Sequence, residues 1–167
     1  MMISWSPPAP CTRCPGSPTR LLRFPTRDAP TESNEPRSVL RATVVTPSGP
    51  VHVVSAHFTH IGAEQRRAQA SAVAGVAAGL DGPVVLAGDL NATIDAPALE
   101  PLTSWLIDAF EASGTPPGDP ARRSCGPWAI DHVLVRGLEP STCRVAREAG
   151  EASDHLPEIA TIGWRAG

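Results

Sequence analysis

The hydrophobic pattern divides the chain near residue 36. Residues 1–36 hold eight of the 19 prolines and show little apolar periodicity. Such a stretch buries too little surface to offset the entropy lost on ordering, so it predicts an irregular or disordered leader. One short strand is expected within it, at residues 21–24. Regular patterns begin at residue 37, and residues 37–167 are expected to form the folded domain.

Alternating and continuous apolar segments predict strands after residue 37. Residues 39–45 and 51–58 alternate on either side of a Pro-Ser-Gly-Pro turn, a pattern typical of a β-hairpin. The apolar run at 83–87 is typical of a buried strand. Further strands are expected at 128–135, 143–148 and 158–162.

Two segments have the spacing of helices. Residues 62–80 are rich in Ala and predict a helix interrupted near Gly75. Residues 98–112 carry large apolar side chains three or four positions apart, which predicts a second helix, and a Pro/Gly loop follows at 113–123. Because strands and helices interleave along the chain, the expected fold class is α+β (or α/β).

Composition and charge exclude several classes of protein. With 167 residues, of which 41% are hydrophobic, the chain can form one core. The 14 basic residues, all Arg, face 17 acidic ones, which argues against a strong basic patch for long nucleic acid. No apolar run is long enough for a membrane span. The start lacks the pattern of a secretory signal, so the chain as written is expected in the cytoplasm.

The four cysteines do not form a recognisable metal or redox motif. Cys11 and Cys14 make an isolated CxxC, and no second pair completes a zinc site. We therefore expect two unpaired, incidental thiols at Cys11 and Cys14, and Cys125 and Cys143 complete the set of cysteines.

The first candidate for chemistry follows the apolar run at 83–87, in the segment Gly-Asp-Leu-Asn. The period of two in a strand places Asp89 and Asn91 on the same side. A carboxylate and an amide so placed can hold a metal-bound water and a phosphoryl oxygen. An Asx turn that ends the strand is the alternative, and both interpretations stay open.

The second candidate is Asp131, inside the apolar segment 130–135. Burying a carboxylate there is costly unless it is paired or functional, and a structural Asp with backbone partners is the alternative. Asp131 shares its face with Val133 and Val135. His132 falls on the opposite face, as a surface or packing residue.

The remaining candidates are histidines and their neighbours. Asp154 and His155 precede the last expected strand. As sequence neighbours they are expected to contact different partners, and a histidine is suited to proton transfer near neutral pH. A polar loop without a function is the alternative. His57 ends the strand 51–58 and is the fourth candidate. His52 and His60 are expected on the surface.

Taken in order, these motifs resemble the endonuclease/exonuclease/phosphatase superfamily, the DNase I-like group, from about residue 35 to residue 164. The resemblance implies a four-layer α-β-β-α sandwich and a divalent-metal-dependent phosphoesterase using Mg²⁺, with Mn²⁺ as an alternative. The substrate would be a phosphoester of a nucleic acid, nucleotide, lipid head group or small molecule.

The resemblance also implies a role for each motif residue. Asp89 and Asn91 match the pair that orients the attacking water and contacts the phosphate, and His57 matches a strand histidine that hydrogen-bonds the phosphate. Asp154 matches an acidic metal ligand. His155 matches the catalytic histidine, either general base or stabiliser of the transition state. Its orienting carboxylate corresponds to Asp131.

One family feature is not matched. The superfamily places a strand ending in Asn and a metal-binding Glu well upstream of the position of His57, whereas 56 residues precede it here and Glu32 and Glu35 lie in the Pro-rich leader. We therefore expect an N-terminally truncated sandwich with an exposed edge and apolar face, and with it low stability, aggregation or dependence on a partner. The alternative function is an inactive fragment or a binding domain. A Ser-His-Asp hydrolase is disfavoured, because no GxSxG motif occurs.

Overall fold

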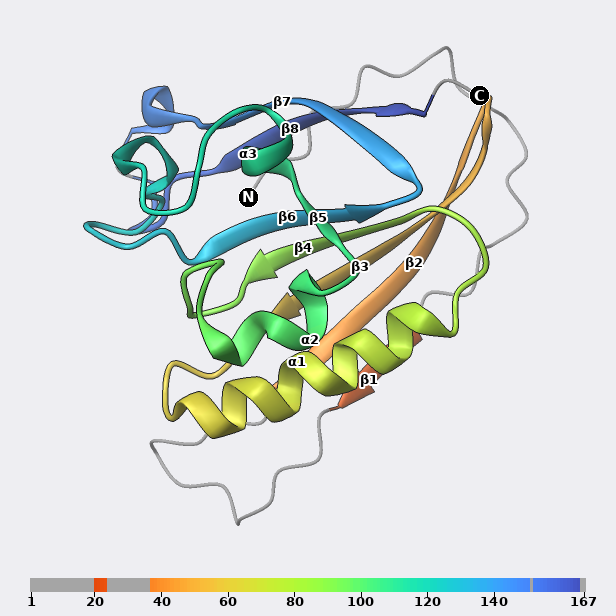
Figure 1. Cartoon of the computed structure of the whole chain (residues 1–167), viewed down its shortest axis with the longest axis horizontal. Helices are drawn as coiled ribbons and strands as arrows, with labels where there is room; N and C mark the ends of the chain where they lie inside the picture. Colours follow the sequence, from red (N-terminus) through yellow and green to blue (C-terminus); the bar gives the residue numbers. More distant parts are fainter. Residues whose placement is uncertain (1–19, 24–36, 151, 166–167) are drawn as a thin grey trace.

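The computed structural model describes residues 20–23, 37–150 and 152–165. These residues form an α+β fold in layers (Figure 1). A six-stranded mixed sheet, in the order β1-β2-β3-β4-β6-β5, has helices α1 and α2 on one face and the two-stranded sheet β7-β8, together with the short helix α3, on the other. The expected fold class is therefore confirmed.

The hairpin predicted by the alternating segments is present. Strands β2 (Ser38–Thr46) and β3 (Gly49–His57) pair antiparallel across the Pro-Ser turn. At the outer edge, β1 (Arg20–Arg23) pairs antiparallel with β2, which confirms the short strand expected in the leader. Phe24, which the prediction included, and the rest of the leader lie outside the described residues.

The centre of the sheet is built by a parallel crossover. Helix α1 (Ala63–Ala78) connects β3 to β4 (Val84–Asp89), which runs parallel to β3. Strand β6 (Asp131–Arg136) then pairs antiparallel with β4, and the two-residue strand β5 (Ile107–Asp108) pairs with β6. This topology brings the ends of β3 and β4 and the start of β6 to one end of the sheet.

Strands β7 (Leu138–Val145) and β8 (Glu158–Trp164) form the second sheet. The strand expected at 143–148 is misplaced, because β7 starts five residues earlier. Its first half carries Pro140 and polar residues, and the register shifts between Pro140 and Thr142, which obscures the alternation in the sequence.

Helix α1 runs without interruption through Gly75, contrary to the expected break. The space around Gly75 is open, with no heavy atom outside the helix backbone and its chain neighbours within 4 Å of an added Cβ. The missing side chain therefore removes no packing contact, and the helix continues past it. None of the helices in the described ranges is long and apolar enough to cross a bilayer.

The single helix expected at 98–112 is wrong. The segment divides into the 3-10 turn η1 (Pro97–Leu99), helix α2 (Glu100–Thr103), strand β5 and helix α3 (Ala109–Ala112). Asp108 begins the new helix by accepting a hydrogen bond from the Glu111 N–H through Oδ1 (2.9 Å). Pairing with β6 and this cap outweigh the helical spacing of the apolar residues.

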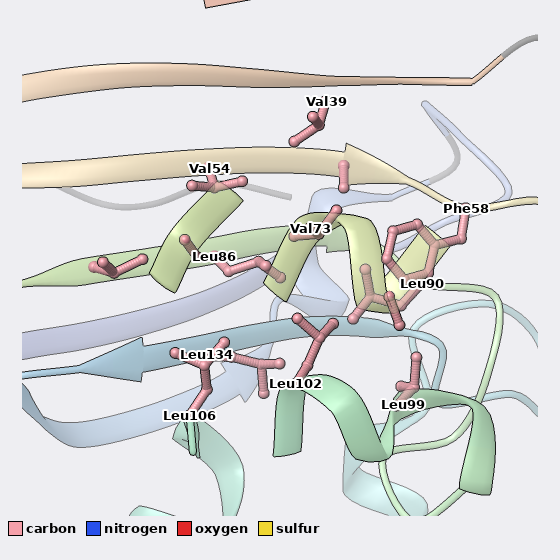
Figure 2. Packing of buried hydrophobic residues seen from close by; sticks show 14 of the residues in the cluster. Val39, Val54, Phe58, Val73, Leu86, Leu90, Leu99, Leu102, Leu106 and Leu134 are labelled. Atoms are coloured by element: carbon pink, nitrogen blue, oxygen red, sulfur yellow. The ribbon is translucent and has the colours of Figure 1, made fainter. Parts of the chain in front are cut away.

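Two cores lie on the two faces of the larger sheet. Figure 2 shows the first, where Val73 of α1 and Leu102 of α2 pack against Val54, Leu86 and side chains from neighbouring strands. The second lies between the sheets and contains, among others, Val85, Val133, Leu138 and Ala160.

Strand β2 exposes apolar side chains on the face of the larger sheet that carries the β7-β8 sheet. Leu40 and Val44 pair with Ser55 and Val51 of β3, and Val51 belongs to the core between the sheets. Leu40 is 42% and Val44 43% exposed. The expected apolar face is therefore present among the described residues.

Candidate active site

Strand register brings three of the predicted residues together. His57, the last residue of β3, pairs with Asp89, the last residue of β4, and Asp89 pairs with Asp131, the first residue of β6. Because β3 and β4 are parallel and β6 runs the other way, two strand ends and one strand start meet at the same edge. His155 reaches this edge from the loop before β8.

Gly88 allows β3 and β4 to approach at this edge. A Cβ at Gly88 would lie 1.7 Å from the backbone oxygen of Ala56 on the neighbouring strand. Only glycine leaves room there, so the residue before Asp89 is dictated by backbone contact.

Asp89 ends its strand in the Asx turn that the sequence left open. Its Oδ1 accepts a hydrogen bond from the Asn91 backbone N–H (2.8 Å), and Asn91 has a left-handed φ of 51°. The Asn91 side-chain amide donates to the Phe58 carbonyl (2.9 Å), which fixes the orientation of that amide. Burial and the charge of Asp131 raise the pKa of Asp89, against the effect of the Asn91 N–H. The turn and the functional interpretation are compatible, because Oδ2 remains directed toward the histidines.

His57 is held between a cation and a carboxylate. The Arg37 guanidinium, which can only donate, lies 3.1 Å from Nδ1, so Nδ1 accepts and Nε2 carries the proton. Nε2 lies 3.2 Å from Asp89 Oδ2 and donates to it. Burial and the Arg37 charge lower the pKa of His57. The neutral imidazole therefore offers an N–H to the site.

The His155 imidazole is hydrogen-bonded to Asp131. Its Nδ1–H donates to Asp131 Oδ2 at 2.7 Å, and Nε2 lies 3.9 Å from Asp89 Oδ2. Burial acts to lower the pKa of His155, but the hydrogen bond to Asp131 and the nearby carboxylates outweigh it and raise that pKa. The imidazole is thus fixed in one tautomer with Nε2 facing the centre of the site.

Ser124 is a site residue that the sequence did not reveal. Its hydroxyl donates to Asp131 Oδ2 at 2.6 Å, and both side chains are buried. The buried Asp131 is thus paired with Ser124 and His155 side chains rather than with the backbone partners of the structural alternative. A serine in the Pro/Gly-rich loop before β6 carries no signal of its own, because the contact depends on how the loop folds back.

Asp154 is exposed. Its Oδ1 accepts a hydrogen bond from the Ser153 hydroxyl (3.3 Å). The carboxylate forms one candidate metal-binding group with Cys125 and His155, while Asp89, Asp131 and His155 form a second such group. Within the described residues His155 is common to both groups.

The other histidines take no part in these contacts. His132 is fully buried, where its Nε2–H donates to the Ala92 carbonyl (2.8 Å), so it is a packing residue. His60 is exposed, as expected. His52 is half-buried rather than simply on the surface: its Nε2–H donates to the Asp81 carbonyl (3.0 Å) and its Nδ1 lies 2.9 Å from the Thr43 hydroxyl.

Solved structures confirm the fold. The chain is similar to a functionally unknown conserved protein of Enterococcus faecalis, with a TM-score of 0.70 at 19% identity, covering 89% of this chain and 66% of that one. It is also similar to a mannosyl-6-phosphatase of Bacteroides thetaiotaomicron (TM-score 0.64, 19% identity, 88% and 66% covered). TDP2 of D. rerio, solved with a single-strand DNA product, gives a TM-score of 0.69 at 18% identity, with 87% and 67% covered.

These structures and the strand-end site define the class as a DNase I-like α+β protein. The sequence profile of the Endonuclease/Exonuclease/phosphatase family matches residues 16–155, and the chain belongs to that family. Members of the family are generally hydrolases. The chain spans only part of the length of its structural relatives, 66% of both the Enterococcus faecalis protein and the Bacteroides thetaiotaomicron phosphatase; among further relatives the share falls to 46%. No curated protein matches it.

Proposed function

We propose that this chain carries the catalytic part of a divalent-metal-dependent phosphoesterase. The observation that supports this most is the meeting of His57, Asp89, Asp131 and His155 at one sheet edge, with the His155 imidazole held by Asp131 at 2.7 Å. Phosphoryl transfer needs an aligned nucleophile and charge stabilisation rather than covalent help from the protein, and this arrangement is suited to both tasks.

His155 is the proposed proton acceptor. Its Nδ1–H is committed to Asp131, so the lone pair on Nε2 is directed to the side where Asp89 lies 3.9 Å away. A water between the substrate phosphorus and Nε2 would give its proton to this nitrogen as its oxygen attacks and the ester P–O bond breaks. Asp131 acts as the positioning residue, because it fixes the tautomer and stabilises the imidazolium that forms.

Asp89 and His57 are proposed to align the reactants. Asp89 Oδ2 is an acceptor for the attacking water, and the His57 Nε2–H is a donor that a phosphoryl oxygen can use in place of Asp89. Asn91 is proposed to contact the phosphate from the turn after Asp89. The proposed substrate class is a phosphoester of a nucleic acid, nucleotide, lipid head group or small molecule, since the donors described contact only the phosphoester itself.

The donor set fits a water-rich Mg²⁺ site. Mg²⁺ is usually held through one or two carboxylates and substrate phosphate oxygens, and it keeps several waters. Asp89, with 15% of its side chain exposed, lies in one candidate metal-binding group with Asp131 and His155, and the exposed Asp154 lies in the other, so each carboxylate is accessible as a ligand. Bound there, the cation would neutralise charge on the phosphoryl oxygens. Mn²⁺ accepts similar oxygen ligands and is the alternative.

Hydrolysis of a chromogenic phosphodiester by the purified full chain, with Mg²⁺ or with chelator, tests this proposal. We expect metal-dependent turnover that falls about 10²-fold or more in Asp89→Ala and in His155→Ala. His60→Ala, which changes an exposed histidine away from these contacts, is the matched control and should retain full activity. Circular dichroism checks that each variant is folded.

Absence of turnover from a folded chain would overturn the proposal and favour a non-catalytic binding role. Turnover that persists in His155→Ala would overturn the assignment of the proton acceptor.

A further inference from the structure

A thiol lies beside the catalytic candidates and has no part in the function proposed above. Cys125, Asp154 and His155 each offer a ligand atom, and these atoms all lie within 4.8 Å of one another. Thiolate, carboxylate and imidazole together are unlike the oxygen set that Mg²⁺ prefers. They are the ligand types of Zn²⁺ and related thiophilic cations.

The backbone fixes the spacing of Cys125 and His155. The two residues form an antiparallel bridge, and Cys125 forms a second bridge with Trp128. On either side, the Leu156 N–H donates to the Ser124 carbonyl (2.7 Å) and the Trp128 N–H to the Cys125 carbonyl (2.8 Å). The thiol and the imidazole therefore lie on paired backbone positions. The backbone that carries these two ligands is already ordered before a cation binds.

The His155 imidazole is also prepared for a cation. Asp131 accepts its Nδ1–H at 2.7 Å, which leaves the lone pair on Nε2 as the nitrogen donor. A carboxylate behind a histidine ligand is a common feature of zinc sites, where it fixes the tautomer and increases the basicity of the ligand. Asp154 belongs to this group, and Asp131 and Asp89 lie 2.7 Å and 3.9 Å from the His155 imidazole, so the negative charge gathered here attracts a divalent cation.

We propose that Cys125, Asp154 and His155 form a binding site for Zn²⁺ that shares Asp154 and His155 with the catalytic centre and adds the Cys125 thiol. Binding replaces the thiol proton, which is released to solvent, and three protein ligands leave further coordination positions for water. Zinc binding does not depend on the proposed function. Its consequence rests on that function: a His155 occupied by Zn²⁺ cannot accept a proton, so Zn²⁺ inhibits the Mg²⁺-supported hydrolysis.

Titration of the full chain with Co²⁺, read by its thiolate charge-transfer absorption, tests the site without an activity assay. Cys11 and Cys14 could bind the same ion, so the experiment uses a Cys11→Ser/Cys14→Ser background. We expect the absorption to be present in this background and Zn²⁺ to displace Co²⁺ from it.

Variants then locate the ligands. Cys125→Ser should abolish the charge-transfer absorption, and Asp154→Asn, at an exposed position, should weaken Co²⁺ binding by about tenfold or more. Cys143→Ser is the matched control, since its thiol donates instead to Glu158 (3.4 Å), and it should leave the absorption unchanged.

Three outcomes would overturn the site: no absorption in the Cys11→Ser/Cys14→Ser background, absorption that survives Cys125→Ser, or absorption lost with Cys143→Ser. Should Cys125→Ser fail to fold, unchanged Co²⁺ affinity in Asp154→Asn would overturn the proposal equally. A chain that binds Co²⁺ as expected but hydrolyses no phosphoester would contradict the proposed function and leave the zinc site standing.

Discussion

At the scale of single residues, Glu158 is a buried carboxyl group whose contribution to stability depends on whether it is protonated. Its side chain is fully buried at the start of β8, where Oε1 accepts hydrogen bonds from the Val133 N–H (3.0 Å) and the Cys143 thiol (3.4 Å). Strand β5 is only two residues long and pairs with Leu134 and Val135 of β6. The neighbouring Val133 N–H therefore donates to the Glu158 side chain instead of to a strand. Burial, with the charges of Asp108 and Asp131, raises the pKa of Glu158 to about 8.

This pKa predicts a loss of stability with rising pH. The unfolded chain releases the Glu158 proton near its usual pKa of 4.5, whereas the folded chain holds it to about 8. The stabilisation is therefore fully present below about pH 4.5 and is lost by about pH 8, at about 1.4 kcal/mol for each pH unit between. Glu158→Gln, a neutral isostere, should lack this dependence.

Urea unfolding of both proteins between pH 5 and 9 measures the effect. The difference in free energy of unfolding between wild type and Glu158→Gln should shift in favour of the variant as pH rises. Glu139→Gln, at an exposed position of β7, is the control and should follow wild type. Parallel curves for wild type and Glu158→Gln would contradict the prediction. His132, whose pKa burial lowers, destabilises the fold below about pH 6.5 in all three proteins alike.

At the scale of elements, glycine has opposite effects on stability at two positions. Gly75 lies on the open side of α1 with no neighbour within 4 Å of an added Cβ, so the helix gains nothing from it. Gly88 lies where β3 and β4 meet, and a Cβ there would approach the Ala56 oxygen to 1.7 Å. The same residue type is therefore a cost in the helix and a requirement in the sheet.

A pair of alanine variants separates these roles. Gly75→Ala should stabilise the protein by about 0.5–1 kcal/mol, because alanine loses less backbone entropy in a helix. Gly88→Ala should destabilise it by about 3 kcal/mol, because the two strands must move apart. Urea denaturation followed by circular dichroism measures both. Equal stability of the two variants would show that the strand contact does not constrain residue 88.

Competition between helical spacing and strand pairing explains why the segment 97–112 is divided into several short elements. Leu99, Leu102 and Leu106 are buried in the first core, as their helical spacing predicted. The chain nevertheless extends at Ile107–Asp108 to pair with β6, and a buried ion pair between Asp108 Oδ1 and Arg122 (2.9 Å) holds that extension in place. Spacing predicted which side chains are buried, while long-range pairing decided the backbone conformation.

At the scale of the whole molecule, the exposed apolar face of β2 makes the behaviour of the chain in solution testable. Leu40 and Val44 lie on the side of the sheet that carries Val51 of the core between the sheets, and both are more than 40% exposed. Exposed apolar surface next to a sheet edge favours aggregation, as the sequence led us to expect.

We therefore expect Leu40→Thr/Val44→Thr to reduce concentration-dependent aggregation, measured by light scattering and sedimentation velocity. Threonine is β-branched, which suits a strand, and it removes apolar surface at both positions. Val45→Thr is the matched control: Val45 is 67% exposed but faces the other side of the sheet, so it should change aggregation little. An equal effect of both changes would show that general surface polarity, rather than this face, controls aggregation.

The sequence by itself indicated most of the strands and the residues that could take part in chemistry, because both depend on local patterns. Periodicity and apolar runs located β2, β3, β4 and β8. Polar residues near strand ends, or inside an apolar run in the case of Asp131, marked the candidate site residues His57, Asp89, Asn91, Asp131, Asp154 and His155. The tertiary structure decided which of these residues meet. Strand register places His57, Asp89 and Asp131 side by side, and a folded loop adds Ser124 and Cys125. Such contacts join residues far apart in the chain, so no local pattern encodes them.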